Sequence, residues 1–386
     1  MDISYILNEL GEDRELYFNA VSPPIIQTSN FAFEKVEDLR LAFEDEMSGY
    51  LYSRGLNPTV DILRKKLAAL DGAEDCLVFN SGASAIFAAV FANVQSGDHI
   101  VSVNKPYTWA WKMFDNVLPR FGITTTYVDG TKIENFERAI LPNTRIIYLE
   151  SPNSLTYELQ DLRAVAELAR ASGIITITDN SYCTPVYQQP LALGIDIAMQ
   201  TATKYLNGHS DTVGGVLCGT AAMMKKIFDS EYLNVGSGIQ PFNAWLLIRG
   251  LRTLPARLDR ITKTSLEVLE FLKSHPKVEA VIFPFDESFP QHELARKQMK
   301  GACGLMTIVL KTQNRGSIVR FCESLKHIMM AVSWGGHESL VIPKCAGFAA
   351  TDFDYHNREH RYVRLYVGLE DSAYLINDLQ QALEEV

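Results

Sequence analysis

The chain has 386 residues, of which 47% are hydrophobic and 21% charged, and its formal net charge is -10. This length predicts two or three domains with a large buried core. The acidic balance argues against non-specific binding to nucleic acid or to an anionic membrane. The first residues lack the basic start and apolar core of a signal peptide, and polar residues interrupt the longest uncharged segment, 76–97. We therefore expect a cytoplasmic protein without a membrane partner.

The cysteines and histidines predict no metal site. The six cysteines form no CxxC pair, and buried reduced thiols are the simplest interpretation. Among the eight histidines, only His356 and His360 have the i, i+4 spacing of a ligand pair. They lie in a charged segment, where a solvated or interfacial helix is the expected structure.

The first half of the chain predicts an arm followed by a large α/β domain. Residues 1–48 contain helix-like pieces and no sustained strand pattern, so we interpret them as an N-terminal arm. From Cys76 onward, short β-rich runs alternate with helical stretches, which is typical of a mainly parallel sheet covered by helices on both faces. The pattern predicts a domain over residues 49–240, with strands near 76–79, 99–103, 123–128, 145–149, 174–178, 197–200 and 215–218.

After residues 236–238 the pattern changes and predicts a smaller C-terminal α/β domain over residues 241–386. A long helical stretch is expected at about 243–274 and a last helix near 372–384. Between them lie apolar runs at 279–283, 305–310, 329–332 and 362–367.

One lysine stands among hydroxyl groups just after the strand predicted at 197–200. Thr201 and Thr203 precede Lys204 directly, at a strand end where ligands bind in open α/β sheets. A lysine shielded from water loses part of its preference for the charged form, so its amine can attack a carbonyl and form a Schiff base. The alternative is an ordinary solvated lysine.

A small-residue corner leads from the first strand into a helix at residues 80–86. The first amides of a helix have no internal partners, so those of Gly82 and Ala83 are candidates to bind a phosphate. No Walker lysine and no GxGxxG is present, which argues against nucleoside triphosphates and dinucleotides. A tight packing corner is the equal alternative.

Three further residue types are candidates for binding a charged planar ligand. Asp179 ends an apolar strand, where it either pairs with a cation such as a protonated pyridine nitrogen or caps a helix. Tyr107 follows the strand at 99–103 and either stacks on a planar ring or packs against protein.

Tyr52 and Arg54 suit phosphate oxygens but lie outside the sheet pattern, where surface positions are the alternative. Arg364 lies within an alternating strand, so its guanidinium faces either water or a carboxylate.

Taken together, these stretches resemble the pyridoxal-phosphate enzymes of the Cys/Met-metabolism family, which includes cystathionine synthases and lyases and methionine γ-lyase. The resemblance runs in order from about residue 20 to the C-terminus. It is carried by residues 201–205 with 208–211, and by 52–54 with 57–59, 81–82, 107, 150–152, 179–180, 249–254, 338–340 and 364–371. It implies a type I pyridoxal-phosphate transferase fold and a homotetramer built as a dimer of dimers with shared active sites.

The resemblance also implies roles for the candidate residues. Lys204 would carry the cofactor as a Schiff base, Asp179 would pair with the ring nitrogen, and Tyr107 would stack on the ring and be catalytic. The phosphate would be bound by Gly82, Ala83, Thr201 and Thr203, and by Tyr52 and Arg54 of the neighbouring subunit. Arg364, helped by the region of Ser333, would bind the substrate carboxylate.

Several departures from the family pattern concern the substrate. Ser154 replaces an asparagine that in the family touches the cofactor's phenolic oxygen, and Ala83 and Ser84 replace methionine and alanine. Ser333 and Trp334 resemble β-lyases. Val332 stands where γ-synthases and other γ-lyases have a glutamate and β-lyases have a tyrosine. Methionine γ-lyases resemble this chain at that position. Trp109 occupies a position near Tyr107 where the family often has a small residue. Together these residues predict a narrow apolar pocket for the distal part of the substrate.

The sequence therefore predicts a carbon-sulfur lyase that eliminates a thiol from a sulfur amino acid to give a 2-oxo acid and ammonia. Trp334 favours β-elimination, as in cystathionine β-lyase, whereas Val332 leaves γ-elimination of a methionine-like substrate open. The main alternative is a γ-replacement transferase of the cystathionine γ-synthase or O-acylhomoserine sulfhydrylase type. A non-enzymatic binding or structural role is a third class, which the joint presence of cofactor-type residues disfavours.

Overall fold

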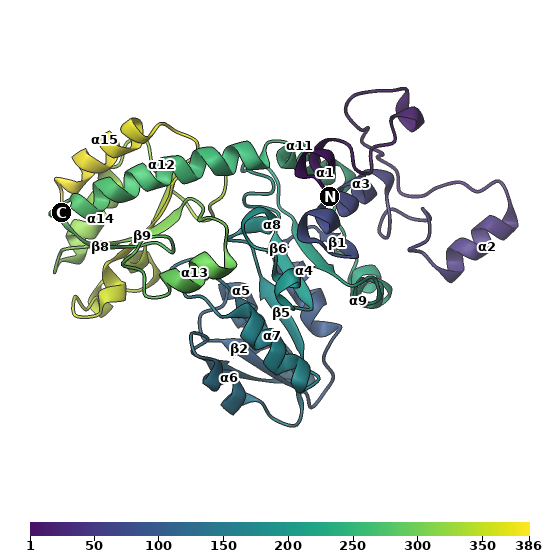
Figure 1. The fold of residues 1–386 in the computed structure, drawn as a ribbon, viewed down its shortest axis with the longest axis horizontal. Helices are drawn as coiled ribbons and strands as arrows, with labels where there is room; N and C mark the ends of the chain where they lie inside the picture. Colours follow the sequence, from purple (N-terminus) through teal and green to yellow (C-terminus); the bar gives the residue numbers. More distant parts are fainter. The chain divides into compact units, whose positions relative to one another are not determined.

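The computed structural model describes residues 1–386, which form two compact units. The larger unit comprises Met1–Pro152, Leu159–Asn207 and Asp211–Arg252, and the smaller comprises Asn153–Glu158, Gly208–Ser210 and Thr253–Val386. Each unit contains one sheet of its own. The elements are labelled in Figure 1.

The larger unit contains a seven-stranded sheet in the order β1-β7-β6-β5-β4-β2-β3. Only β7 runs opposite to the other six strands, so the prediction of a mainly parallel sheet is confirmed. The strands are β1 (Asp75–Phe79), β2 (His99–Val103), β3 (Thr124–Val128), β4 (Thr144–Glu150), β5 (Ile175–Asp179), β6 (Ile197–Thr201) and β7 (Gly215–Gly219).

Helices cover both faces of this sheet because the central strands are apolar on both sides. Ile146 and Tyr148 of β4 belong to an apolar cluster with α4 and α5, whereas Ile147 and Leu149 belong to a second cluster with α6 and α7. The helices after the arm are α3 (Pro58–Asp71), α4 (Gly82–Phe91), α5 (Thr108–Lys112), α6 (Ile133–Ala139), α7 (Leu162–Ala171), α8 (Thr184–Tyr187), α9 (Ala221–Ile227), α10 (Leu233–Val235) and α11 (Pro241–Leu251).

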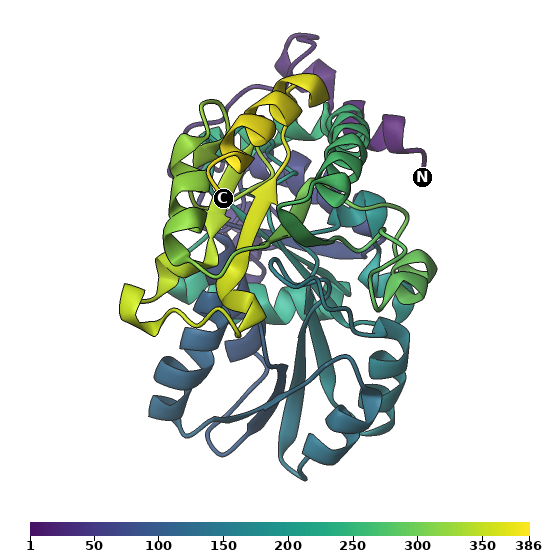
Figure 2. The ribbon, with the colours of Figure 1, turned by 90° about the vertical axis from the view of Figure 1, so that its left-hand side faces the viewer.

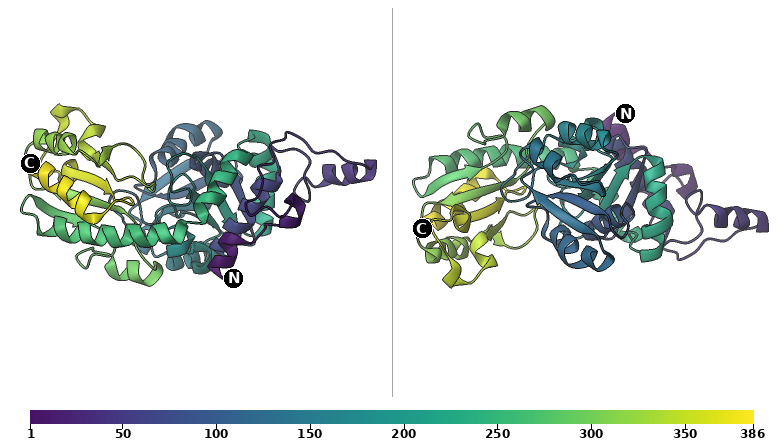
Figure 3. Two further views of the ribbon diagram at one scale, coloured as in Figure 1. Left: turned by 90° about the horizontal axis from the view of Figure 1, so that it is seen from above. Right: turned by 90° about the horizontal axis from the view of Figure 1, so that it is seen from below.

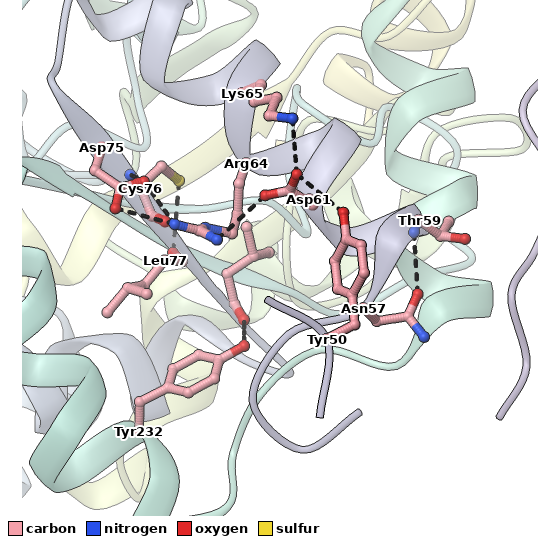
Figure 4. Close-up of polar contacts among 11 residues, drawn as sticks. Tyr50, Asn57, Thr59, Asp61, Arg64, Lys65, Asp75, Cys76, Leu77 and Tyr232 are labelled. Atoms are coloured by element: carbon pink, nitrogen blue, oxygen red, sulfur yellow. Dashed lines mark hydrogen bonds and ion pairs between the residues drawn. The ribbon is translucent and has the colours of Figure 1, made fainter. Parts of the chain in front are cut away.

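The N-terminal segment of the larger unit contains α1 (Ile3–Asn8) and α2 (Val36–Glu44), and only Ala42 is buried in α2. The start of α3 anchors this segment. The Thr59 hydroxyl donates to the carbonyl of Pro24 at 2.9 Å, and the Asn57 amide donates to the carbonyl of Ile26 at 2.9 Å. Figure 4 shows Asn57 also capping α3 by accepting from the Thr59 amide.

The smaller unit contains a five-stranded sheet in the order β10-β11-β12-β9-β8. Its long helix α12 runs along the sheet, as the green helix in Figure 3 shows, and α15 is the yellow helix in Figure 2. The elements are β8 (Val278–Ile282), β9 (Leu305–Leu310), β10 (Met329–Met330), β11 (Leu340–Pro343), β12 (Tyr362–Tyr366), α12 (Leu254–Ser274), α13 (His292–Gln298), α14 (Arg315–Ser324) and α15 (Ser372–Leu383).

Two details of the sequence prediction are corrected here. The helical stretch expected at 243–274 is two helices, because α11 ends at Leu251 and α12 begins at Leu254 with a proline in its first turn, where the missing amide does no harm. Strand β11 was not predicted. The six cysteines are free and buried, as expected. No helix in the structure is long and apolar enough to cross a membrane.

Candidate active site

Lys204 lies in the turn that follows β6, and the start of β7 holds this turn in place. The Ala202 amide donates to the carbonyl of Gly214 at 2.9 Å. The Thr203 hydroxyl both accepts from the Gly214 amide at 3.1 Å and donates to the Gly214 carbonyl at 3.3 Å. These bonds tie the two residues before Lys204 to Gly214, which directly precedes β7, so the backbone leading into the lysine is fixed.

Asp179 ends β5, the strand next to β6, and pairs in register with Met199. Its side chain is buried and accepts from the Ser181 amide at 2.9 Å. Burial raises the pKa of Asp179 above its ordinary value, and the positive charge of Lys204 opposes this rise. The helix-cap alternative fails, because the next helix, α8, has Cys183 as its N-cap residue. Asp179 is therefore a buried carboxyl group near Lys204 that gains from a further cationic partner.

The corner at the start of α4 is packed tightly against the end of β6. Ser81 is the N-cap residue, and its hydroxyl accepts from the Ser84 amide at 3.1 Å. A Cβ atom added to Gly82 would lie 2.9 Å from Cβ and 3.0 Å from Oγ1 of Thr201. Only glycine allows this approach, which brings the Thr201 hydroxyl beside the first amides of a ten-residue helix. This arrangement is suited to an anion.

Tyr107 is the N-cap residue of α5, and its amide donates to the side-chain carboxylate of Glu150 at the end of β4. Its pKa is raised by burial and by the nearby negative charges of Asp179 and Glu150. The phenol therefore lies at the same edge of the sheet as Asp179 and stays protonated at neutral pH.

Trp109 lies in α5, and the Lys112 ammonium group is 4.5 Å from the centre of its ring. Trp109 and Ala83 line one cavity of about 340 Å³ between α4 and the α5 region. The structure thus places Trp109 beside the corner at the start of α4, while 57% of its surface remains exposed.

Tyr52 and Arg54 lie in a loop before α3. The Arg54 guanidinium is 5.5 Å from the centre of the Tyr52 ring, and the Ser53 hydroxyl accepts from the Asn57 amide at 3.0 Å. Both residues line a different cavity, together with aromatic residues of the N-terminal segment such as Phe31 and Phe43.

In the smaller unit, Arg364 of β12 is held by backbone carbonyl groups. Its guanidinium donates to the carbonyl of Ser333 at 3.2 Å and to that of Ser154 at 3.3 Å. The buried Tyr157 senses the charge of Arg364. Burial raises the pKa of Tyr157, and the positive charge of Arg364 opposes this rise. These two bonds restrict the direction of the guanidinium, whose planar group of donors suits a carboxylate.

The residues beside this guanidinium differ in exposure. Val332 is 82% exposed, whereas Trp334 is buried, and Ser333 between them has the left-handed φ of +82°. The turn at residues 153–156 is held by the Asn153 side chain. Its amide oxygen accepts from the backbone amides of Leu155 at 3.0 Å and Thr156 at 2.8 Å.

Two functional contacts were not predicted from the sequence. Glu150 and Asn153 were noted only within a family motif, and neither the bond from Tyr107 to Glu150 nor the turn around Asn153 follows from residue spacing. The only signal was the position of Glu150 at the end of a buried strand. The role of Ser154 in this structure comes from its backbone carbonyl, which any residue would supply.

These features fit pyridoxal phosphate. The corner at Gly82 suits its phosphate, the buried carboxyl group of Asp179 suits its protonated ring nitrogen, and Lys204 offers an amine to its aldehyde. The mainly parallel sheet, with lysine and aspartate at the ends of neighbouring strands and a smaller sheet-containing unit, is the type I fold of pyridoxal-phosphate enzymes.

The chain belongs to the family of Cys/Met metabolism PLP-dependent enzymes, whose model matches residues 6–384. It is 38% identical to an L-methionine gamma-lyase of Treponema denticola over 96% of this chain and 94% of that protein. It is 36% identical to an L-methionine gamma-lyase of Pseudomonas putida, over 97% and 95% of the two chains. It is 35% identical to a cystathionine gamma-lyase of Bacillus subtilis, over 95% of each chain.

Proposed function

We propose that this protein is a pyridoxal-phosphate-dependent carbon-sulfur lyase that removes a thiol from the γ-carbon of a sulfur amino acid, giving a 2-oxo acid and ammonia. The arrangement of Lys204 and Asp179 at neighbouring strand ends beside the Gly82 corner carries the proposal. The names of the similar proteins favour γ-elimination over the β-elimination that Trp334 suggests.

In this proposal, the chain's residues position the reactants and move protons. When bound, the cofactor withdraws electrons from the α-carbon of the substrate. The Lys204 amine would remove the α-proton, give it up again, and then remove a β-proton, because a leaving group on the γ-carbon requires both. Asp179 keeps the ring nitrogen protonated. Tyr107 stacks on the ring and gives its proton to the departing thiolate, a role that its raised pKa supports.

The smaller unit supplies substrate binding in this proposal. Arg364 binds the α-carboxylate, helped by Ser333, and its two carbonyl partners support this role by fixing the guanidinium. Val332 and Trp334 contact the apolar distal part of the substrate in this proposal, and the same role is assigned to Trp109 from the family resemblance. An acidic residue at position 332 would favour a substrate that carries a second ammonium group, as cystathionine does. Valine at this position therefore favours a methionine-like substrate.

We also propose a homotetramer made of two dimers, in which Tyr52 and Arg54 of one subunit bind the cofactor phosphate of the next, together with Gly82, Ala83, Thr201 and Thr203. The position of Tyr52 and Arg54 in a cavity other than that of Ala83 supports this arrangement. Residues 1–48 would serve as an arm in assembly, 49–240 as the cofactor domain and 241–386 as the C-terminal domain. The buried free cysteines favour a reducing, cytoplasmic compartment.

A substrate panel tests the proposal. Purified holoenzyme is incubated with methionine, cystathionine, cysteine or O-acylhomoserine, with and without an added thiol, and 2-oxo acids, ammonia and thioethers are quantified. We expect 2-oxobutanoate, ammonia and methanethiol from methionine without added thiol. Pyruvate as the main product would point to β-elimination instead. A thioether formed only when thiol is added would make the enzyme a γ-replacement transferase and contradict the proposal.

A further inference from the structure

Two buried carboxyl groups end neighbouring strands on one face of the larger sheet. Glu150 of β4 pairs in register with Asp179 of β5, and both side chains are less than a tenth exposed. Tyr148, two residues before Glu150, belongs to the apolar cluster that packs under α4 and α5. Alternation along β4 therefore places Glu150 on the same face as the Gly82 corner.

Glu150 reaches from the sheet to the beginning of α5. Its carboxylate accepts from the backbone amide of Tyr107, 43 residues earlier in the chain. Tyr107 precedes the first residue of α5, so this bond fixes the backbone from which its ring projects. A negative charge at this end of a helix is also favourable, because the first amides carry partial positive charge.

A glutamate at this position carries a cost. It buries a second acidic group beside Asp179, and its charge also raises the pKa of the Tyr107 phenol. A neutral acceptor would bind the same amide without this repulsion, but a charge-assisted bond is about twice as strong as a neutral one. The charged carboxylate therefore holds the Tyr107 backbone more firmly than a neutral acceptor would.

We propose that Glu150 is a positioning residue that holds Tyr107 at the orientation in which its ring stacks on the cofactor. This inference rests on the proposed function, since it assumes that pyridoxal phosphate binds beside Tyr107. It assigns Glu150 no contact with substrate or cofactor. Its effect on the cofactor passes through Tyr107.

A double-mutant cycle between Glu150→Ala and Tyr107→Ala tests the proposal. The apoenzyme of each variant is titrated with pyridoxal phosphate, and the dissociation constant and the visible circular dichroism of the bound cofactor are measured. We expect Glu150→Ala to weaken binding about tenfold and to diminish the visible signal, and Glu150→Gln, which keeps an acceptor, to stay within about threefold of wild type. In the Tyr107→Ala background, Glu150→Ala should change neither quantity further.

The outcomes separate this inference from the function on which it rests. If Glu150→Ala weakens binding equally in both backgrounds, the residue does not act through Tyr107 and the inference is wrong. If Tyr107→Ala leaves both quantities unchanged, the stacking role assigned to Tyr107 fails, and the inference fails with it. Should Glu150→Ala not fold, Glu150→Met replaces it in the cycle, because it removes the acceptor at nearly constant volume.

Discussion

Arg364 is a cation that backbone carbonyl groups help to orient. Its guanidinium donates to the carbonyl groups of Ser333 and Ser154, which carry no net charge. These bonds restrict the direction of the guanidinium, and its planar fork of donors suits bidentate binding of the substrate carboxylate in the proposed function.

Replacing Arg364 should therefore weaken substrate binding. Arg364→Ala should raise the KM for the amino-acid substrate by about 10- to 100-fold, because a hydrogen bond to a charged group contributes about 1.5–3 kcal/mol. The KM of Arg364→Lys should lie between those of the wild type and Arg364→Ala, since lysine keeps the charge but not the planar fork of donors. Steady-state kinetics measure both. Arg320→Ala is the control, because that half-exposed arginine lies on α14 and bonds to Ser317 and the C-terminal segment. Unchanged saturation in Arg364→Ala would show that another group binds the carboxylate.

At the scale of elements, the start of α4 depends on a single missing side chain. Gly82→Ala would place a Cβ atom 2.9 Å from Thr201, so α4 would have to move away from β6. We expect cofactor binding to weaken about tenfold, because the first-turn amides lose their alignment with the phosphate. Titration of the apoenzyme measures this. Gly49→Ala is the matched control, since a Cβ atom at Gly49 meets nothing within 4 Å. Equal cofactor affinity in the two variants would contradict a phosphate site at the start of α4.

The end of α3 carries a buried acid whose effect is on stability. Asp71 is buried, its carboxylate accepts from the Gln200 amide of β6 at 2.6 Å, and its other oxygen has no hydrogen-bond partner. Burial raises the pKa of Asp71 to about 7 from an ordinary value of 3.8. A raised folded-state pKa contributes stability that is fully present below pH 3.8 and is lost as the pH rises through 7.

Asp71→Asn should therefore flatten the pH dependence of stability. Between pH 5 and pH 8, the wild type should lose roughly 3 kcal/mol of unfolding free energy relative to the variant, from a linkage of 1.36 kcal/mol per pKa unit. Urea unfolding at both values measures the difference, and comparing changes rather than absolute stabilities removes any constant cost of the asparagine amide. Parallel pH dependence in the two proteins would mean that Asp71 titrates normally.

The elements differ in how far they could be predicted from sequence. All seven strands of the larger sheet were expected within two residues of their ends, because each is a short run of residues common in strands that alternates with helical stretches. In the smaller unit β11 was missed, since Leu340–Pro343 is only four residues long and follows directly on the polar Glu338-Ser339. Asp179 could be found because it ends a strand, and Lys204 because it follows a strand end closely. The bond between Glu150 and Tyr107 could not, because it joins distant segments through a backbone atom.

At the scale of the whole molecule, the proposed assembly makes each active site depend on two chains. Lys204 and Gly82 belong to one corner of the larger unit, whereas Tyr52 and Arg54 line a separate cavity beside the N-terminal segment. Large apolar side chains of this segment are exposed in the single chain, with Phe18 at 99% and Phe43 at 67%. Exposed apolar surface of this kind is expected at an interface between proteins.

Subunit mixing tests this dependence directly. Lys204→Ala and Arg54→Ala should each be nearly inactive alone. After the two variants are unfolded together in equal amounts and refolded, half of the dimers should be hybrids, and each hybrid should have one site in which both residues are intact. Activity should therefore return to about a quarter of the wild-type value, because symmetric exchange leaves one site in four complete. Refolding each variant separately is the control. A mixture that stays as inactive as its components would place Arg54 in the same site as Lys204 of its own chain and would exclude the shared arrangement.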